Sequence, residues 1–170
     1  MKRILLTGMS GTGKSTVIVK LTALGYKAID LDCDEFSEWV DVDPGTTPLT
    51  PAPGKDWLWR VDRVQQLLLT KDSDVLIVSG CAENIGQFLP LFDEVVLLSA
   101  PPPVIIERLA TRTNNPFGKQ HQEVEQVLAL QQTIEPLLRM SASHEIDTSI
   151  GIDEVVGCLS AIIQANTNKQ

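Results

Sequence analysis

Residues 8–15 read GMSGTGKS, and this stretch decides the fold of the chain. It fits the pattern G-x-x-x-x-G-K-[ST], follows an apolar strand expected at residues 2–7, and opens a helix expected at residues 13–24. Glycines let the backbone turn tightly, so that several N–H groups point inward, and the helix N-terminus adds partial positive charge. The stretch therefore predicts a phosphate-binding loop, or P-loop.

The P-loop predicts which groups meet a nucleoside triphosphate. We expect the Lys14 ammonium to reach the β- and γ-phosphates and the Ser15 hydroxyl to bind Mg²⁺. ATP and Mg²⁺ are therefore the predicted cofactors. The residues of this stretch that we expect to bind the nucleotide are Gly8, Met9, Ser10, Gly11, Thr12, Gly13, Lys14, Ser15 and Thr16.

Two further patterns separate the classes of P-loop protein. The guanine-binding sequence N-K-x-D of GTPase switches is missing, since the one Asn-Lys pair is Asn168-Lys169, followed by Gln170. The apolar strand expected at residues 74–79 ends in Ser79-Gly80, without the acid that motor-type hydrolases use to hold magnesium and activate water. Both patterns weigh against a GTPase or a hydrolase.

Strand and helix signals alternate along the whole chain, which predicts an α/β protein with the three-layer P-loop NTPase fold. We expect a five-stranded parallel sheet with helices on both faces, forming a single domain over residues 1–170. A proline-rich surface loop is expected at residues 41–54. The expected strands are 2–7, 26–31, 74–79, 94–99 and 145–147, and the expected helices are 13–24, 33–40, 56–70, 85–89, 103–111, 122–139 and 152–165.

Composition and charge indicate which partners and compartments are expected for this chain. The formal net charge is −8, and an acidic surface repels phosphate backbones, so we expect neither nucleic acid nor an anionic membrane as a partner. The longest apolar runs are too short for a signal peptide core or a membrane span. The odd number of cysteines, without a CxxC pair, predicts a reducing cytoplasm and no zinc site. We expect a monomer or a small homo-oligomer.

Two acids lie at the end of the second expected strand, at Asp30 and Asp32. Residues two apart in a strand lie on the same face, so both carboxylates can point to the carboxyl edge of the sheet beside the P-loop, where open α/β sheets bind ligands. Asp30 could hold Mg²⁺ through water, and Asp32 could accept a hydroxyl proton from a phosphate acceptor. The alternative is that one of them caps the following helix.

Arginines and tryptophans gather in a few segments. A guanidinium binds phosphate or carboxylate through two parallel hydrogen bonds, and Arg108 and Arg112, four apart on one helix, could bring a cation to the transferring phosphate. Surface ion pairing is the alternative for both. One of Arg60 and Arg63 could face the site.

Trp39, Trp57 and Trp59 flank the proline-rich loop. They either pack this loop against the core or form an aromatic wall for a flat acceptor.

The chain resembles the shikimate kinase branch of the adenylate-kinase-like phosphotransferases. The likeness rests on residues 8–16, on the D-x-D at Asp30 and Asp32, on Gly80 after the third strand, and on residues 135–139 and 145–148. It implies a substrate-binding insertion over residues 33–70 and a mobile lid over residues 112–121. It further implies that Asp30 lies near Mg²⁺, that adenine packs on the segment around Ser149, and that Asp32, Arg139 and Arg60 touch the acceptor. Gly80, after the third strand, and Trp57, from the aromatic wall, complete the acceptor-binding residues that we expect.

The sequence departs from that family at three places. Ser79-Gly80-Cys81 stands where shikimate kinases have a triple glycine, and Asn115 stands before Pro116 where their lid has an arginine. The proline-rich insertion is also unlike theirs. We therefore do not carry over shikimate as the acceptor.

These patterns predict an ATP- and Mg²⁺-dependent enzyme that moves the γ-phosphoryl group to a hydroxyl of a small-molecule acceptor. Lys14, Asp32 and Arg112 are the expected catalytic residues. The alternatives are a nucleoside monophosphate kinase, with Arg60 and Arg63 holding the acceptor phosphate, and a non-enzymatic ATP-binding regulatory protein.

Overall fold

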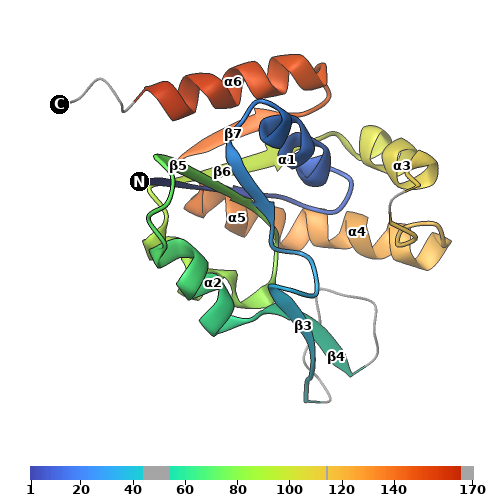
Figure 1. Cartoon of the computed structure of the whole chain (residues 1–170). Helices are drawn as coiled ribbons and strands as arrows, with labels where there is room; N and C mark the ends of the chain where they lie inside the picture. The colour runs from blue at the N-terminus through green and yellow to red at the C-terminus, as the bar shows by residue number, and fades with distance from the viewer. Residues whose placement is uncertain (44–53, 114, 166–170) are drawn as a thin grey trace.

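The computed structural model describes residues 1–43, 54–113 and 115–165, and within them it is built on a five-stranded parallel sheet of strand order β2-β5-β1-β6-β7 (Figure 1). The strands of this sheet are β1 (Lys2–Thr7), β2 (Lys27–Asp30), β5 (Val75–Ser79), β6 (Glu94–Ser99) and β7 (His144–Asp147). The predicted α/β class and the five-stranded parallel sheet are confirmed. With β1 at its centre, the sheet brings the P-loop beside the carboxyl ends of its two neighbours.

Helices cover both faces of the sheet, as Figure 1 shows. The helices are α1 (Lys14–Ala23), α2 (Val61–Leu69), α3 (Pro102–Thr111), α4 (His121–Thr133), α5 (Glu135–Ser141) and α6 (Ile152–Gln164), with short 3-10 turns η1 (Glu83–Gln87) and η2 (Leu89–Leu91). Two antiparallel strands, β3 (Ser37–Asp41) and β4 (Lys55–Trp59), form a separate hairpin beside the sheet.

Alternation along the strands divides the core into two layers. In β1, Ile4 and Leu6 pack with α1 and α6 on one face, while Leu5 packs with α2 and α5 on the other. The central strands are buried on both faces, as parallel strands between two helix layers must be. A third cluster, around Ile105 and Leu109, joins α3 to α4 above the P-loop.

The structure corrects three predicted elements. The helix predicted at 33–40 is wrong, because Ser37–Asp41 is strand β3. The helix predicted at 56–70 begins only at Val61, because Lys55–Trp59 pairs with β3 as strand β4. The helix predicted at 122–139, with a disturbance at Pro136, is two helices that meet at Ile134. The break lies where the disturbance was predicted, because Pro136 cannot donate a backbone hydrogen bond. Of the predicted loop 41–54, residues 44–53 lie outside the described residues.

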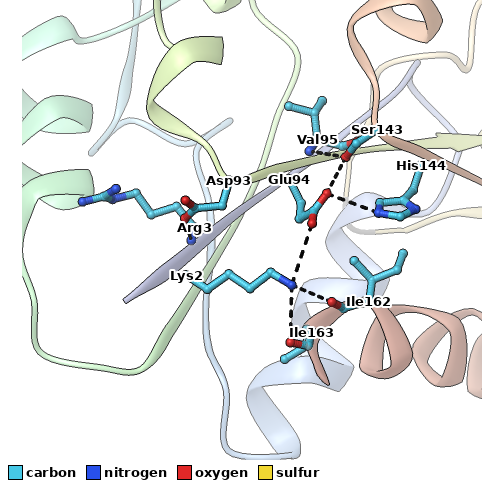
Figure 2. A network of polar contacts seen from close by, with 9 residues as sticks. All are labelled: Lys2, Arg3, Asp93, Glu94, Val95, Ser143, His144, Ile162 and Ile163. Carbon is cyan, nitrogen blue, oxygen red and sulfur yellow. Dashed lines mark hydrogen bonds and ion pairs between the residues drawn. The ribbon is translucent and has the colours of Figure 1, made fainter. Parts of the chain in front are cut away.

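A polar network ties the amino-terminal edge of the sheet to the last helix (Figure 2). The Lys2 ammonium donates to the carbonyl oxygens of Ile162 (2.6 Å) and Ile163 (3.4 Å) in the last turn of α6, and it lies 4.0 Å from Glu94. Glu94 in turn accepts a hydrogen bond from the Ser143 hydroxyl and lies 3.2 Å from the His144 ring. A cation at a helix C-terminus is favourable, so this contact fixes α6 against β1 at the edge remote from the P-loop.

No helix among the described residues is long and apolar enough to span a bilayer.

Candidate nucleotide and acceptor site

A cavity of about 760 Å³ opens at the carboxyl edge of the sheet, around the P-loop. Four groups of residues contribute to it: the P-loop with the start of α1, the ends of β2 and β5, the hairpin, and the α3–α4 and β7–α6 segments. Among the described residues, those that line it are Gly8, Met9, Ser10, Gly11, Thr12, Gly13, Lys14, Ser15, Thr16, Val17, Asp30, Asp32, Trp39, Trp57, Cys81, Arg108, Thr111, Arg112, Asn115, Phe117, Val127, Leu130, Thr148, Ile150, Ile152 and Val155.

The P-loop backbone needs its glycines. Gly11 and Gly13 have φ values of 87° and 96°, which favour glycine. A Cβ on Gly8 would lie 2.2 Å from the Leu98 carbonyl oxygen, so only glycine lets the loop pass this close to β6. The Lys14 ammonium folds back over the loop and donates to the Gly8 carbonyl oxygen at 2.8 Å. The cationic side chain is thereby held over a loop of backbone N–H groups, which suits a phosphate chain.

Asp30 and Ser15 meet directly. The Ser15 hydroxyl donates to Oδ2 of Asp30 at 2.7 Å, and the Ser79 hydroxyl donates to Oδ1 at 3.0 Å. Mg²⁺ prefers oxygen ligands, and a hydroxyl beside a carboxylate at the start of the P-loop helix supplies them. The donor set thus fits Mg²⁺, either bound directly or through water. Within the described residues no group of three or more His, Cys, Asp and Glu side chains forms a self-contained metal site.

Asp32 lines the same cavity, near Lys14. Its Oδ1 accepts a hydrogen bond from the Trp59 indole nitrogen at 3.3 Å. The carboxyl group faces the open cavity, yet protein surrounds it closely, and this desolvation raises its pKa to about 6, while the nearby Lys14 ammonium opposes the rise. Gly80 makes room for this arrangement, because a Cβ there would lie 2.9 Å from Oδ1 and 2.7 Å from the Trp59 ring.

Hydrogen bonds within the segment between α3 and α4, and from it to the end of α3, hold its described residues together. The Arg112 guanidinium donates to the Phe117 carbonyl oxygen, and the Lys119 ammonium donates to the carbonyl oxygens of Ala110 (2.7 Å) and Arg112 (2.6 Å). The Glu123 carboxylate accepts from the backbone nitrogens of Gly118, Lys119 and Gln120. Nε of Arg112 is buried without a partner among the described residues, and burial lowers the pKa of Arg112. A cation with an unused donor therefore borders the cavity from this segment.

Arg108 connects three segments around the P-loop. Its guanidinium donates to the Thr148 hydroxyl at 2.8 Å and to the Thr148 carbonyl oxygen, and it lies 3.4 Å from the carbonyl oxygens of Gly11 and Thr12. The Thr148 hydroxyl itself donates to the Thr12 carbonyl oxygen at 2.7 Å. Arg108 thus braces the loop from behind as well as lining the cavity.

The structure brings most of the predicted site residues together. The nine residues 8–16, together with Asp30, Asp32, Trp57, Arg108 and Arg112, all line the one cavity. Four predicted residues are not among its described lining residues: Arg60, Gly80, Arg139 and Ser149. Gly80 still adjoins the cavity because it packs against Asp32. Next to Ser149, the neighbouring residues Thr148 and Ile150 take the lining positions instead.

Arg60 and Arg139, the two arginines predicted to touch an acceptor, are both bound to glutamates. The Arg60 guanidinium lies 3.2 Å from Glu38, and its Nε donates to the Ser37 carbonyl oxygen. Arg139 holds Glu145 through two hydrogen bonds of 2.8 and 2.9 Å and also holds Glu135 at 2.9 Å, and these carboxylates raise the pKa of Arg139 further above its usual range.

Several lining residues carry no sequence signal of their own. Phe117, Val127, Leu130, Ile150 and Ile152 line the cavity as apolar side chains at ordinary helix or loop positions. Their apolar character is equally typical of a core residue, so only the folded arrangement separates the two roles. Cys81 is the polarisable residue that the sequence places after β5, and the structure sets it beside Asp32 and Lys14, where burial raises the pKa of its thiol.

A parallel sheet of this order, with a P-loop leading from its central strand into a helix, defines the class of P-loop nucleotide-binding proteins with a kinase-like fold. The chain belongs to the AAA domain family, whose model matches residues 4–129. A curated relative, named "Nucleotide-binding protein", from Cellvibrio japonicus (strain Ueda107), is 26% identical over 164 residues. That match covers 88% of this chain and 48% of the relative, so the chain spans about half the relative's length.

Two solved structures have a similar fold. Shikimate kinase from Acinetobacter baumannii, solved in complex with shikimate, has a TM-score of 0.67 and 20% sequence identity, covering 99% of this chain and 96% of that chain. Shikimate kinase from Bacteroides thetaiotaomicron has a TM-score of 0.65 and 18% identity, covering 96% of this chain and 98% of that chain. The predicted likeness to the shikimate kinase fold is therefore confirmed.

Proposed function

We propose that the protein is an ATP- and Mg²⁺-dependent phosphotransferase that moves the γ-phosphoryl group to a hydroxyl of a small-molecule acceptor. The observation that carries this proposal is the placement of Asp32, a carboxylate that lines the same cavity in which the Lys14 ammonium is held over the P-loop. A second carboxylate in the cavity, beside Lys14, is a group that transfer to a hydroxyl requires as proton acceptor.

Each group in the cavity has a part in such a transfer. The P-loop N–H groups and Lys14 bind the β- and γ-phosphates and neutralise their charge. Bound by Ser15 and Asp30, Mg²⁺ would supply further neutralisation of the phosphate oxygens. Asp32 accepts the proton of the attacking hydroxyl, and its pKa of about 6 leaves it ionised at neutral pH. Arg112 adds a cation from the α3–α4 segment.

The same proposal divides the chain into working parts. Residues 1–170 form one kinase-like domain, in which residues 33–70 bind the acceptor and residues 112–121 act as a lid that closes over the phosphates. The hairpin tryptophans Trp39 and Trp57 and the Arg112 side chain all line the cavity, which supports this division. The three free thiols, Cys33, Cys81 and Cys158, support a reducing compartment, and hence the cytoplasm, as its place of action.

A nucleoside monophosphate as the acceptor is less well supported. It would need paired cations in the insertion to hold its phosphate, but Arg60 is bound to Glu38 and Lys55 lies 3.8 Å from Asp41. Arg63 is exposed on α2 and is not among the described residues that line the cavity. An alcohol acceptor requires none of these cations.

The proposal is tested by acceptor-dependent ADP release across a panel of hydroxyl compounds, together with calorimetry of Mg²⁺-ATP binding. Lys14→Ala is expected to abolish nucleotide binding. Asp32→Asn is expected to keep ATP affinity and to slow transfer by about 10²-fold or more. Asp62→Asn, at an exposed position on α2, is the matched control and should leave both unchanged. Slow ADP release that no acceptor stimulates would instead support a nucleotide-binding regulatory protein.

A further inference from the structure

The end of the cavity beyond Lys14 is where an acceptor must lie to meet the γ-phosphate. We call this the acceptor end and define it by Asp32, Trp39, Trp57 and Cys81, which line the cavity there. The rings of Trp39 and Trp57 are paired across the hairpin, with centroids 4.9 Å apart and planes tilted by 59°. The acceptor end therefore offers aromatic surface and a carboxylate.

Three basic residues line the cavity among those that the structure describes: Lys14, Arg108 and Arg112. Lys14 and Arg108 contact the P-loop, and Arg112 belongs to the segment between α3 and α4. Lys14 also lies near Asp32, where its positive charge is offset by that carboxylate. None of the four residues of the acceptor end is basic.

The hairpin does not supply a cation either. Its two basic residues, Arg60 at the end of β4 and Lys55 at its start, face Glu38 and Asp41 across the hairpin, at 3.2 and 3.8 Å. Residues 44–53, which connect the two strands, contain no charged residue in the sequence. An acidic acceptor would therefore meet each of these cations beside a carboxylate that already offsets its charge.

The positive charge of Arg139 is offset by two carboxylates. Glu145 binds its guanidinium through two hydrogen bonds, and Glu135, whose side chain is only 6% exposed, binds it through a third. The three groups together carry a net charge of one negative unit. A carboxylate or phosphate brought here would meet repulsion and not an open cation.

We propose that the acceptor is a hydroxyl compound without a carboxylate or phosphate, either neutral or cationic, whose apolar face packs on Trp57. This inference rests on the proposed phosphotransferase function and names its substrate class. The charges carry this inference, because Asp32 is the one acid and no base is present among the four residues of the acceptor end. Arg60 and Arg139, which do not line the cavity, are already paired with carboxylates. Such a surface favours cations and tolerates neutral groups. The fold neighbour that was solved with shikimate binds a carboxylate-bearing acceptor, so the proposal separates this chain from it.

The test compares matched acceptors that differ only in charge. Hydroxy acids, shikimate among them, are offered with γ-labelled ATP beside their methyl esters, along with neutral polyols and amino alcohols. We expect kcat/KM for the esters to exceed that for the parent acids by about tenfold or more. A ratio of one, or a preference for the acids, would overturn this inference and leave the phosphotransferase proposal intact. Absence of label on every compound would overturn that proposal and this inference with it.

A charge variant provides a second, independent measurement. Glu38→Gln removes the carboxylate that compensates Arg60, so activity toward the acids should rise several-fold while activity toward the esters stays within about twofold. Glu38 and Arg60 form an exposed pair, so the variant should fold. Glu107→Gln, on the exposed side of α3, is the control and should change neither activity. An unchanged ester-to-acid ratio in Glu38→Gln would overturn the charge argument.

Discussion

The indole nitrogen of Trp59 donates a hydrogen bond of 3.3 Å to Oδ1 of Asp32, from a ring that is only 1% exposed. The backbone of Trp59 is held in turn by the Asn84 side chain, which accepts from its N–H at 3.1 Å and donates to its carbonyl oxygen at 2.8 Å. The carboxylate that faces the cavity is therefore positioned by the hydrophobic core beneath the hairpin. A flexible side chain is in this way given one orientation before any ligand arrives.

Trp59→Phe tests this positioning. Phenylalanine keeps most of the apolar ring but cannot donate to Asp32, so we expect kcat to fall about tenfold with the KM for ATP unchanged. Loss of one hydrogen bond should lower the free energy of unfolding by about 1 kcal/mol, measured by urea denaturation. Trp57→Phe is the comparison, since Trp57 lines the acceptor end and should change the acceptor KM instead. Equal kcat values for the two variants would contradict a positioning role for Trp59.

Gly80→Ala tests the space between Asp32 and Trp59. A Cβ would lie 2.7 Å from the buried Trp59 ring, so the ring or the backbone must shift, and we expect destabilisation of about 1–3 kcal/mol with a loss of transfer activity. Gly157→Ala in α6 is the control, because nothing lies within 4 Å of its Cβ and alanine favours helix. Thermal unfolding of both variants measures this destabilisation. A Gly80→Ala protein as stable as the unsubstituted protein would mean that the Trp59 ring can shift without cost.

The P-loop and the acids after β2 were predictable because their spacing is itself the physical constraint. The glycines, Lys14 and Ser15 occupy fixed places along a turn that leads directly into a helix, and Asp30 ends β2 with Asp32 two residues further, so that both line the cavity at this edge of the sheet. Short-range geometry of this kind can be inferred from the order of residues alone.

The hairpin could not be predicted in the same way. Residues 55–59 read KDWLW and run almost directly into α2, so the apolar residues of both elements give one continuous helical pattern. The strand forms because Trp57 and Trp59 pair with β3, a partner on the far side of the proline-rich residues. Tertiary pairing of this kind overrides a local pattern, and this error in turn hid the ion pair between Glu38 and Arg60.

Glu83→Gln tests a pair of acids under the hairpin. The fully buried Asp56 carboxyl raises the pKa of Glu83 from its ordinary 4.5 to about 7, because a protonated Glu83 can donate to it. The folded state then binds a proton more tightly than the unfolded state, so stability should fall as pH rises from about 4.5 to about 7 and level off above that. A glutamine at position 83 donates at every pH.

Thermal unfolding of the two proteins between about pH 5 and pH 8 measures this effect. We expect the melting temperature of Glu83→Gln to exceed that of the unsubstituted protein at pH 8, and the difference to shrink toward pH 5. Glu107→Gln is the control and should keep the original pH dependence. If the difference in melting temperature between the Glu83→Gln and unsubstituted proteins does not change with pH, Glu83 does not donate a proton to Asp56 in a hydrogen bond.

Arg108→Lys tests whether the brace behind the P-loop matters for nucleotide binding. The guanidinium contacts the hydroxyl and the carbonyl oxygen of Thr148 and lies near two P-loop carbonyl oxygens, and an ammonium cannot reproduce this planar set of donors. We expect the charge to be kept but the loop to lose its support, so that Mg²⁺-ATP binds roughly tenfold more weakly and stability falls by about 1–2 kcal/mol. Arg63→Lys, at an exposed position on α2, should alter neither quantity. Calorimetry separates the outcomes: weaker binding with unchanged stability would mean that Arg108 acts on the nucleotide alone, whereas unchanged binding with lost stability would confine it to the fold.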